Sequence, residues 1–101
     1  MIDLDRIEGF DWDEGNSRKS ADKHGVGQAE AEQVFLNEPL LLAEDERHSR
    51  AEARFHALGR TDAGRPVHVT FTLRHGGTKV RVISARDMSR KERSHYEQEQ
   101  G

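Results

Sequence analysis

Alternation of apolar and polar residues through residues 54–86 limits the fold of this chain more than any other feature of its sequence. Three runs, "ARFHALGRT", "VHVTFTLR" and "KVRVISAR", follow the two-residue period of a strand with one buried face. The stretches between them, "DAGRP" and "HGGT", are short and contain glycine, as tight turns between antiparallel strands do. The second half of the chain is therefore predicted to be a meander of three antiparallel strands.

The two turns set the expected register of this meander. A two-residue loop at Gly76-Gly77 places Arg74 opposite Lys79. One face is then apolar and is expected to lie on helices: Val67, Val69, Phe71, Leu73, Val80 and Val82. The other face is polar and cationic: His68, Thr70, Thr72, Arg74, Lys79 and Arg81.

The first turn decides where Arg60 points. A three-residue loop at 62–64 pairs Phe55 with Phe71 and puts Arg60 on the polar face, whereas a loop one residue longer turns Arg60 to the other side. The pairing of two Phe residues favours the first register. In the same register Arg86 ends its strand on the apolar face.

Along the chain, helices are expected both before and after the meander. A weak helix over residues 14–24 is followed by a better one within 27–39, and "LLLAED" reads as a strand. Ser89 and Glu92 have capping-box spacing, so residues 90–100 are predicted to close the chain as a helix. The expected class is α+β: an antiparallel β-meander with two N-terminal helices packed on one face and a short C-terminal helix.

At 101 residues the chain is expected to form one domain, residues 1–101. It has no cysteine, which excludes disulfides and thiolate metal sites. The start, "MIDLDRIEGF", lacks the pattern of a signal peptide, and the longest apolar run, 40–43, is too short to span a bilayer. A cytoplasmic protein without membrane association is therefore expected.

Charge is divided unevenly along the chain. Residues 1–59 carry 7 Lys/Arg against 14 Asp/Glu, a balance of −7, whereas residues 60–101 carry 9 against 5, a balance of +4. The segment "SARDMSRKERSHY" alone holds four Lys/Arg and a histidine. A basic half can bind a polyanion even when the whole protein is acidic, although a charge run is often only a solvated surface.

Four stretches in order resemble the BrnT family of type II toxins: "FDWDEGNSRKSADKHGV", "VFLNEPLLLAEDERHS", "RFHALGRTDAGRPVHVTFT" and "RVISARDMSRKERSHYE". The resemblance covers nearly the whole chain. It implies a small ribonuclease of RelE-like fold that cleaves RNA, either free or on the ribosome, and so inhibits translation. It also implies inhibition by a BrnA antitoxin that carries a ribbon-helix-helix DNA-binding domain, in a hetero-oligomer. The chain departs from the family at Gly15, Asn16 and Ser20, which weaken its first helix, and in its acidic N-terminal half.

A ribonuclease without metal needs a base for the 2′-hydroxyl, positive charge beside the phosphorane and an acid for the leaving 5′-oxygen. Guanidinium and imidazole groups supply these functions, and no cofactor or metal is expected. The candidates for the catalytic site are Arg60, Arg74, Arg81, Arg86, Lys23, His24 and His48. The candidates for RNA binding are Arg90, Lys91, Arg93, Lys79 and His68.

Several of these residues also have a purely structural interpretation. Arg86 could be the ion-pair partner of Glu92 or Asp45, and the cations of "KHG" could meet the dipole at a helix end. A metal site is disfavoured because no histidine spacing suits one helix face, and His56 and His68 are expected to point to different partners. The alternative function is a degenerate toxin that only holds a DNA-binding antitoxin.

Overall fold

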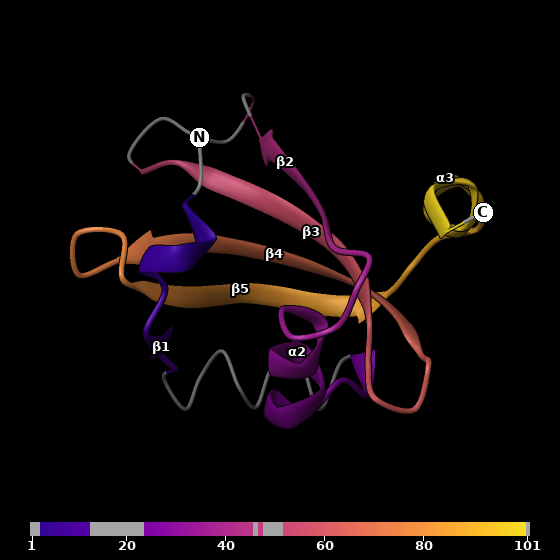
Figure 1. Cartoon of the computed structure of the whole chain (residues 1–101), viewed down its shortest axis with the longest axis horizontal. Helices are drawn as coiled ribbons and strands as arrows, with labels where there is room; N and C mark the ends of the chain where they lie inside the picture. The colour runs from indigo at the N-terminus through magenta and orange to yellow at the C-terminus, as the bar shows by residue number, and fades with distance from the viewer. Residues whose placement is uncertain (1–2, 13–23, 46, 48–51, 101) are drawn as a thin grey trace.

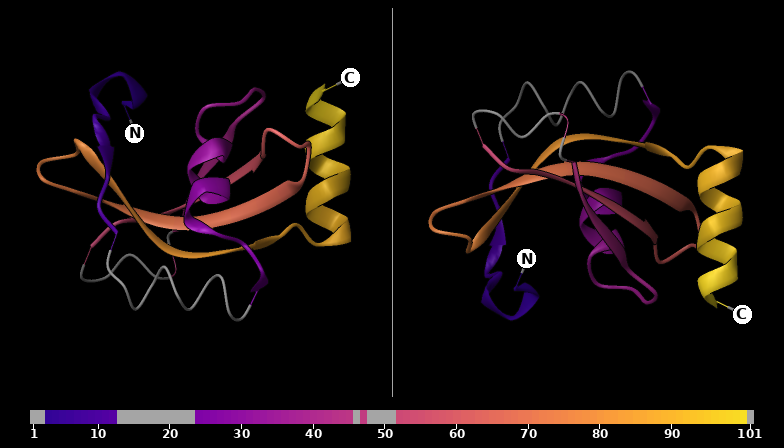
Figure 2. Two further views of the ribbon diagram at one scale, coloured as in Figure 1. Left: turned by 90° about the horizontal axis from the view of Figure 1, so that it is seen from below. Right: turned by 90° about the horizontal axis from the view of Figure 1, so that it is seen from above.

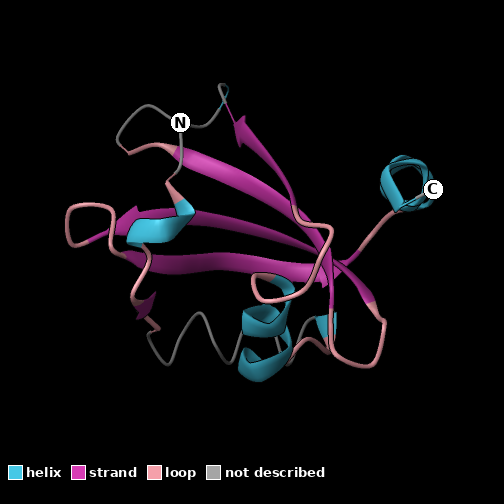
Figure 3. Cartoon of the chain, in the orientation of Figure 1, coloured by secondary structure: helices cyan, strands magenta, loops and turns pink. Residues whose placement is uncertain are grey.

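A computed structural model describes most of the chain as an α+β fold built on one five-stranded sheet (Figures 1 and 3). The described residues are 3–12, 24–45, 47 and 52–100. The strands are β1 Gly9–Phe10, β2 Leu41–Asp45, β3 Arg54–Arg60, β4 Pro66–Arg74 and β5 Lys79–Asp87. The helices are the short 3-10 helix η1 Leu4–Arg6, α2 Gln28–Val34 and α3 Arg90–Gln100. Most of the helix expected over 14–24 lies outside the described residues.

The predicted meander is present, but the sheet is mixed rather than purely antiparallel. Its strand order is β1-β5-β4-β3-β2, and β1 runs parallel to β5 at the edge. The expectation of an antiparallel sheet was wrong in this one strand. The segment "GFDW" does suggest a short strand, but a strand of two residues is too short for its sequence to show how it pairs, so the parallel pairing with β5 was not predicted.

Both predicted registers are confirmed, and one of the two turns differs in length. Phe55 pairs with Phe71, and the Thr61 amide donates to the Arg65 carbonyl (3.0 Å), which closes a loop at 62–64. Arg74 pairs with Lys79 as expected. The second turn, however, has four residues, 75–78, and positive φ angles at three of them, including 56° at His75.

A β-bulge in β5 corrects the predicted position of Arg86. Thr70 pairs with Ser84 while Phe71 pairs with Val82, so that Ile83 is the extra residue. Beyond the bulge every side chain of β5 changes face relative to a regular strand. Arg86 therefore pairs with His68 on the polar face.

Helix α2 covers the apolar face of the sheet (Figure 2). Ala31 and Val34 of this helix are buried, and Val34 lies directly over Gly59 of β3. The helix ends at Val34, earlier than the predicted stop at Pro39. The core is formed by buried residues from α2, from the segment before it and from the three long strands: Val26, Ala31, Val34, Ala57, Val67, Val69, Phe71, Val80, Val82 and Ala85.

Helix α3 begins with the predicted capping box and lies at the end of the sheet where β4 begins and β5 ends (Figure 2). The Glu92 amide donates to Ser89 Oγ (3.2 Å), and the Ser89 amide donates to Glu92 Oε1 (2.8 Å). The Tyr96 hydroxyl donates to the Pro39 carbonyl (2.6 Å), which ties the helix to the segment that enters β2. Among the described helices, none is long and apolar enough to span a membrane.

Candidate active site

The polar face of the sheet brings together two histidines and a carboxylate from three strands. His56 Nε2 lies 2.9 Å from Asp45 Oδ2, and His56 Nδ1 lies 3.0 Å from His68 Nε2. The hydroxyl oxygen of Thr70 is 3.2 Å from the same His56 Nδ1. Asp45, His56 and His68 thus form a hydrogen-bonded chain, which we call the histidine chain. The expectation that the two histidines point to different partners was wrong.

The carboxylate fixes how protons are distributed along the histidine chain. A carboxylate only accepts, so Asp45 holds a proton on His56 Nε2 and leaves the lone pair of neutral His56 on Nδ1. His68 Nε2 then donates to that lone pair, and His68 Nδ1 keeps the unprotonated lone pair. This assignment agrees with the surroundings of His68 Nδ1, a buried atom without a hydrogen-bond partner in the described part of the protein.

Burial is the main influence on His68. The residue is 7% exposed, and this burial, followed by the charge of Arg86, lowers the pKa of its imidazole to about 4. His68 is therefore neutral near pH 7.

An ion pair between Arg86 and Glu92 links the sheet to α3 beside the histidine chain. Arg86 donates from both terminal nitrogens to the two carboxylate oxygens of Glu92, at 2.8 and 3.0 Å. Hydrogen bonding from Arg86 lowers the pKa of Glu92 to about 2 against the opposing effect of burial, with a further contribution from the Ser89 amide. The same pairing raises the pKa of Arg86. Arg86 is thus half-buried and already has an anionic partner.

These groups surround a cavity of about 380 Å³ between α3 and the sheet. The apolar residues that line it are Leu41, Leu42, Ala43 and Leu58. The polar residues that line it are His56, His68, Arg86, Glu92 and His95. Three imidazoles, a guanidinium and a carboxylate around one small cavity are groups able to move protons and bind polar ligands.

A second cationic group lies at the other end of the same face, where β4 and β5 meet their turn. Arg74, Lys79 and Arg81, here called the cationic strip, share this face by register. Arg74 pairs with Glu52 at 3.3 Å, and Arg81 lies 3.9 Å from Asp11. The Arg74 Nε atom is buried and has no hydrogen-bond partner among the described residues.

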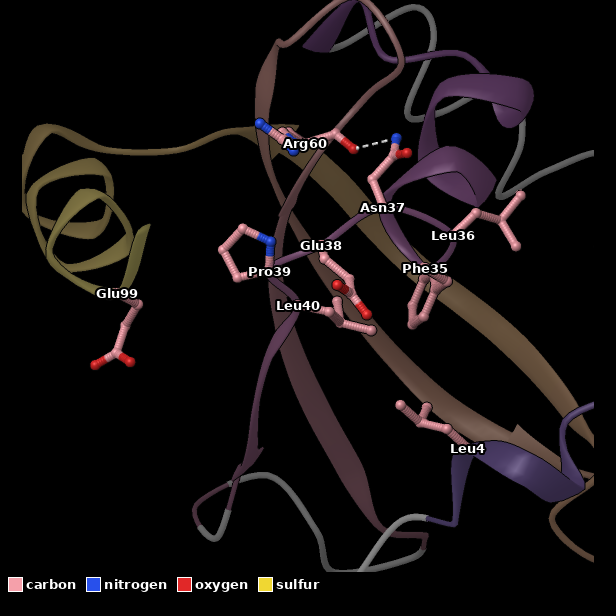
Figure 4. Close-up of a pocket in the computed structure, with 9 residues that line it drawn as sticks. All are labelled: Leu4, Phe35, Leu36, Asn37, Glu38, Pro39, Leu40, Arg60 and Glu99. Atoms are coloured by element: carbon pink, nitrogen blue, oxygen red, sulfur yellow. Dashed lines mark hydrogen bonds between the residues drawn. The ribbon is translucent and has the colours of Figure 1, made fainter. Parts of the chain in front are cut away.

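The other candidate residues are spread over the molecule. Arg60 is exposed and lines a separate groove of about 850 Å³ with residues of the α2–β2 connection (Figure 4). His24 lies near Arg65, which donates to its carbonyl at 3.4 Å. The three cations of α3 are exposed on that helix: Arg90, Lys91 and Arg93. Lys23 and His48 lie outside the described residues.

Sequence reasoning missed His56, His95 and the role of Asp45. The alternation placed His56 on the polar face, but only the pairing of β3 with both neighbours brings Asp45 and His68 to its two ring nitrogens. The described residues contain no group of three or more His, Cys, Asp or Glu arranged to hold a metal ion.

Comparisons with known proteins identify the family. The chain shares its fold with the crystal structure of the Brucella abortus ribonuclease toxin BrnT, with a TM-score of 0.61 and 23% sequence identity over 81% of this chain and 97% of that one. No curated protein sequence matches the chain significantly. Residues 12–92 match the family described as "Ribonuclease toxin, BrnT, of type II toxin-antitoxin system". The chain therefore belongs to the BrnT family of ribonuclease toxins.

Proposed function

We propose that this protein is an endoribonuclease that cleaves RNA without a metal ion and thereby inhibits translation. The observation that carries the proposal is the histidine chain beside Arg86 on the open face of the sheet. Attack of a 2′-hydroxyl on its neighbouring phosphate needs a group that accepts a proton near neutral pH, and imidazole is the side chain best suited to this. In this proposal the 2′-hydroxyl replaces His68 Nε2 as the donor to the lone pair on His56 Nδ1, and His56, held by Asp45, then takes the proton.

RNA reaches these groups along the polar face. The cationic strip would hold backbone phosphates on one side, because guanidinium groups bind phosphate oxygens through paired hydrogen bonds. Arg86 and His68 then lie beside the nucleotide whose 2′-hydroxyl attacks, and Arg90, Lys91 and Arg93 extend the cationic surface onto α3. Arg60, Lys23, His24 and His48 remain catalytic candidates on the ground of sequence alone.

The proposed partner is a BrnA-like ribbon-helix-helix antitoxin, bound in a hetero-oligomer, and the proposed location is the cytoplasm. The groove in Figure 4 suits an antitoxin segment. Leu36 (77% exposed) and Leu4 (43% exposed) are the exposed large hydrophobic residues of the described chain, and both line this groove. Glu38 and Glu99, also in the groove, have no ion-pair partner among the described residues and favour a segment that flanks an apolar side chain with Lys or Arg.

A second function, a non-catalytic module that only holds an antitoxin, is favoured by the state of the cations. Arg74, Arg81 and Arg86 each have an acidic neighbour, at 3.3, 3.9 and 2.8 Å. Phosphate must compete with Glu52, Asp11 and Glu92 for these groups. On the ribosome the RNA is already positioned. A RelE-like site that works there would therefore overcome the competition between phosphate and these carboxylates more easily.

Cleavage of a labelled mRNA, alone and during translation, distinguishes the two functions. The measurement is made with the wild type, Arg74→Ala and Arg81→Ala, and the arm with free mRNA is run with and without EDTA, because translation itself needs Mg²⁺. The ribonuclease predicts product in at least one condition, weaker cutting by both variants and no effect of EDTA. Absence of product under every condition, with antitoxin binding retained, would establish the non-catalytic module.

A further inference from the structure

We propose that the cavity between α3 and the sheet is a nucleobase-binding slot that accepts one base of the bound RNA and prefers a base with an exocyclic amine. The slot rests on the proposed function for its ligand, since a ribonuclease must hold single-stranded RNA. Its evidence is independent of catalysis and consists of the size, the walls and the charges of the cavity.

The size and the walls of the cavity suit a flat ring. A volume of about 380 Å³ is at the small end of ligand sites and leaves room for one nucleotide rather than several. Leu41 and Leu58, a register pair of β2 and β3, form an apolar wall for the face of a base. His95 lies at the rim on α3, and imidazole is among the side chains on which bases stack.

The charges inside the cavity favour a base over a phosphate. Glu92 is ionised at neutral pH because its pKa lies near 2, and it neutralises Arg86. His68 adds no charge because its pKa lies near 4. A phosphate entering the cavity would meet the Glu92 carboxylate beside the single cation Arg86, whereas the cationic strip outside holds three cations against the two carboxylates of Glu52 and Asp11. The base therefore enters the cavity and the backbone stays on the open face.

One carboxylate oxygen has capacity for the edge of a base. Glu92 Oε1 accepts from Arg86 and from the Ser89 amide, both at 2.8 Å. Among the described residues, Glu92 Oε2 accepts a hydrogen bond only from Arg86, at 3.0 Å, and it lies 4.0 Å from His68 Nε2. A carboxylate oxygen can accept a second hydrogen bond, and an exocyclic amine can donate it. Cytosine, adenine and guanine carry such an amine, whereas uracil would turn a carbonyl oxygen toward the carboxylate.

The first experiment compares mononucleotides on the intact protein. CMP, UMP and ribose 5-phosphate are titrated while NMR follows the ring signals of His56, His68 and His95. Because a hydrogen bond to a charged group is lost, we expect CMP to bind at least about tenfold more tightly than UMP. Ribose 5-phosphate should leave the three rings unmoved. Equal affinity for CMP and UMP, or equal shifts with ribose 5-phosphate, would overturn the slot.

The second experiment fills the cavity from its edge strand. Ala43 is an exposed residue of β2 that lines the cavity opposite His56, so Ala43→Trp should abolish the CMP shifts. Ala63→Trp, at an exposed turn position outside the cavity, is the matched control and should bind CMP like the wild type. His95→Ala serves as a second variant on a different element, and it should weaken CMP binding without removing a buried group. Unchanged binding by both cavity variants contradicts the slot.

The slot and the ribonuclease activity fail in different ways. If CMP binds as predicted but no RNA is cut, the slot stands and the proposed function falls. If RNA is cut while CMP neither binds nor moves the histidine signals, the function stands and the slot falls.

Discussion

His56 Nδ1 and His68 Nε2 face each other at 3.0 Å across β3 and β4, although the two residues stand twelve positions apart in the chain. The ring centroids are 4.9 Å apart, and Asp45 occupies the far nitrogen of His56. Two imidazoles this close cannot both be charged at low cost. The pKa of His68, which burial lowers to about 4, gives the site a pH dependence that can be measured.

Stability should fall as the pH drops below about 6.5, through His68. The unfolded histidine has a pKa near 6.5 and the folded one near 4, so between these values the unfolded state binds more protons. The contribution of His68 to the free energy of unfolding is then fully present above pH 6.5, and it declines by up to about 3 kcal/mol as the pH approaches 4. Glu92, with a pKa lowered from 4.5 to about 2, adds a further loss below pH 4.5.

Urea unfolding at pH 7, 5.5 and 4 measures this decline. His68→Gln is the comparison, because it keeps a polar side chain and removes the titration. The variant should lose the dependence between pH 6.5 and 4.5 and retain the loss attributed to Glu92. A variant with the same pH profile as the wild type would show that His68 is not responsible.

Gly59, where α2 packs against β3, should tolerate no side chain. A Cβ built on Gly59 would lie 2.6 Å from Val34 Cγ1 and 3.0 Å from the Val34 carbonyl oxygen. Gly59→Ala should therefore lower the free energy of unfolding by about 1–3 kcal/mol, the usual cost of overpacking a core. Thermal unfolding of Gly59→Ala, Val34→Ala and the double variant tests the contact. Additive losses would contradict it, since removal of Val34 Cγ1 should relieve part of the clash.

Much of this fold could be predicted because its signals are local. The two-residue alternation fixed the pairing of Phe55 with Phe71, and the spacing of Ser89 and Glu92 located the start of α3. The bulge at Ile83 was not predicted, although the adjacent apolar residues Val82 and Ile83 break the alternation at that point. The histidine chain could not be predicted from local signals, because it depends on tertiary structure. Asp45 and His68 reach His56 from two different neighbouring strands.

RNA binding should lose part of its salt dependence when the cationic strip is reduced. Each phosphate contact on a single strand contributes roughly 0.7 to the slope of log K against log salt. Arg81→Ala should lower the slope by about this amount, and Lys91→Ala should do the same only if α3 also contacts RNA. Fluorescence anisotropy at several salt concentrations gives the slopes. An unchanged slope in both variants would mean that RNA does not follow this face.

The groove beside α2 should lose its antitoxin when its exposed leucine becomes charged. Leu36 is 77% exposed, so Leu36→Asp should leave the thermal midpoint nearly unchanged. If the leucine side chain is buried by the partner, affinity for a co-expressed BrnA-like antitoxin should fall by about tenfold or more. Ala63→Asp introduces the same charge at an exposed turn and serves as the control. Equal affinities of the two variants, measured by calorimetry, would show that the antitoxin binds to another surface.

Removal of the His56 imidazole should abolish most of the cleavage while RNA still binds. His56→Gln deletes the proposed proton acceptor, and general acid–base catalysis contributes typically 10²–10⁴-fold, so the rate at saturating RNA should fall by about this range. Asp45→Asn should act through His56: it no longer fixes the proton on Nε2, so it should shift the pH–rate profile and lower the rate less than His56→Gln. His75→Gln is the matched control, because His75 lies exposed in the turn at 75–78, with Asp11 at 3.5 Å as its neighbour. Single-turnover rates across pH separate these variants, and RNA affinity is measured in parallel. Cleavage by His56→Gln at the rate of His75→Gln would exclude the histidine chain from the reaction.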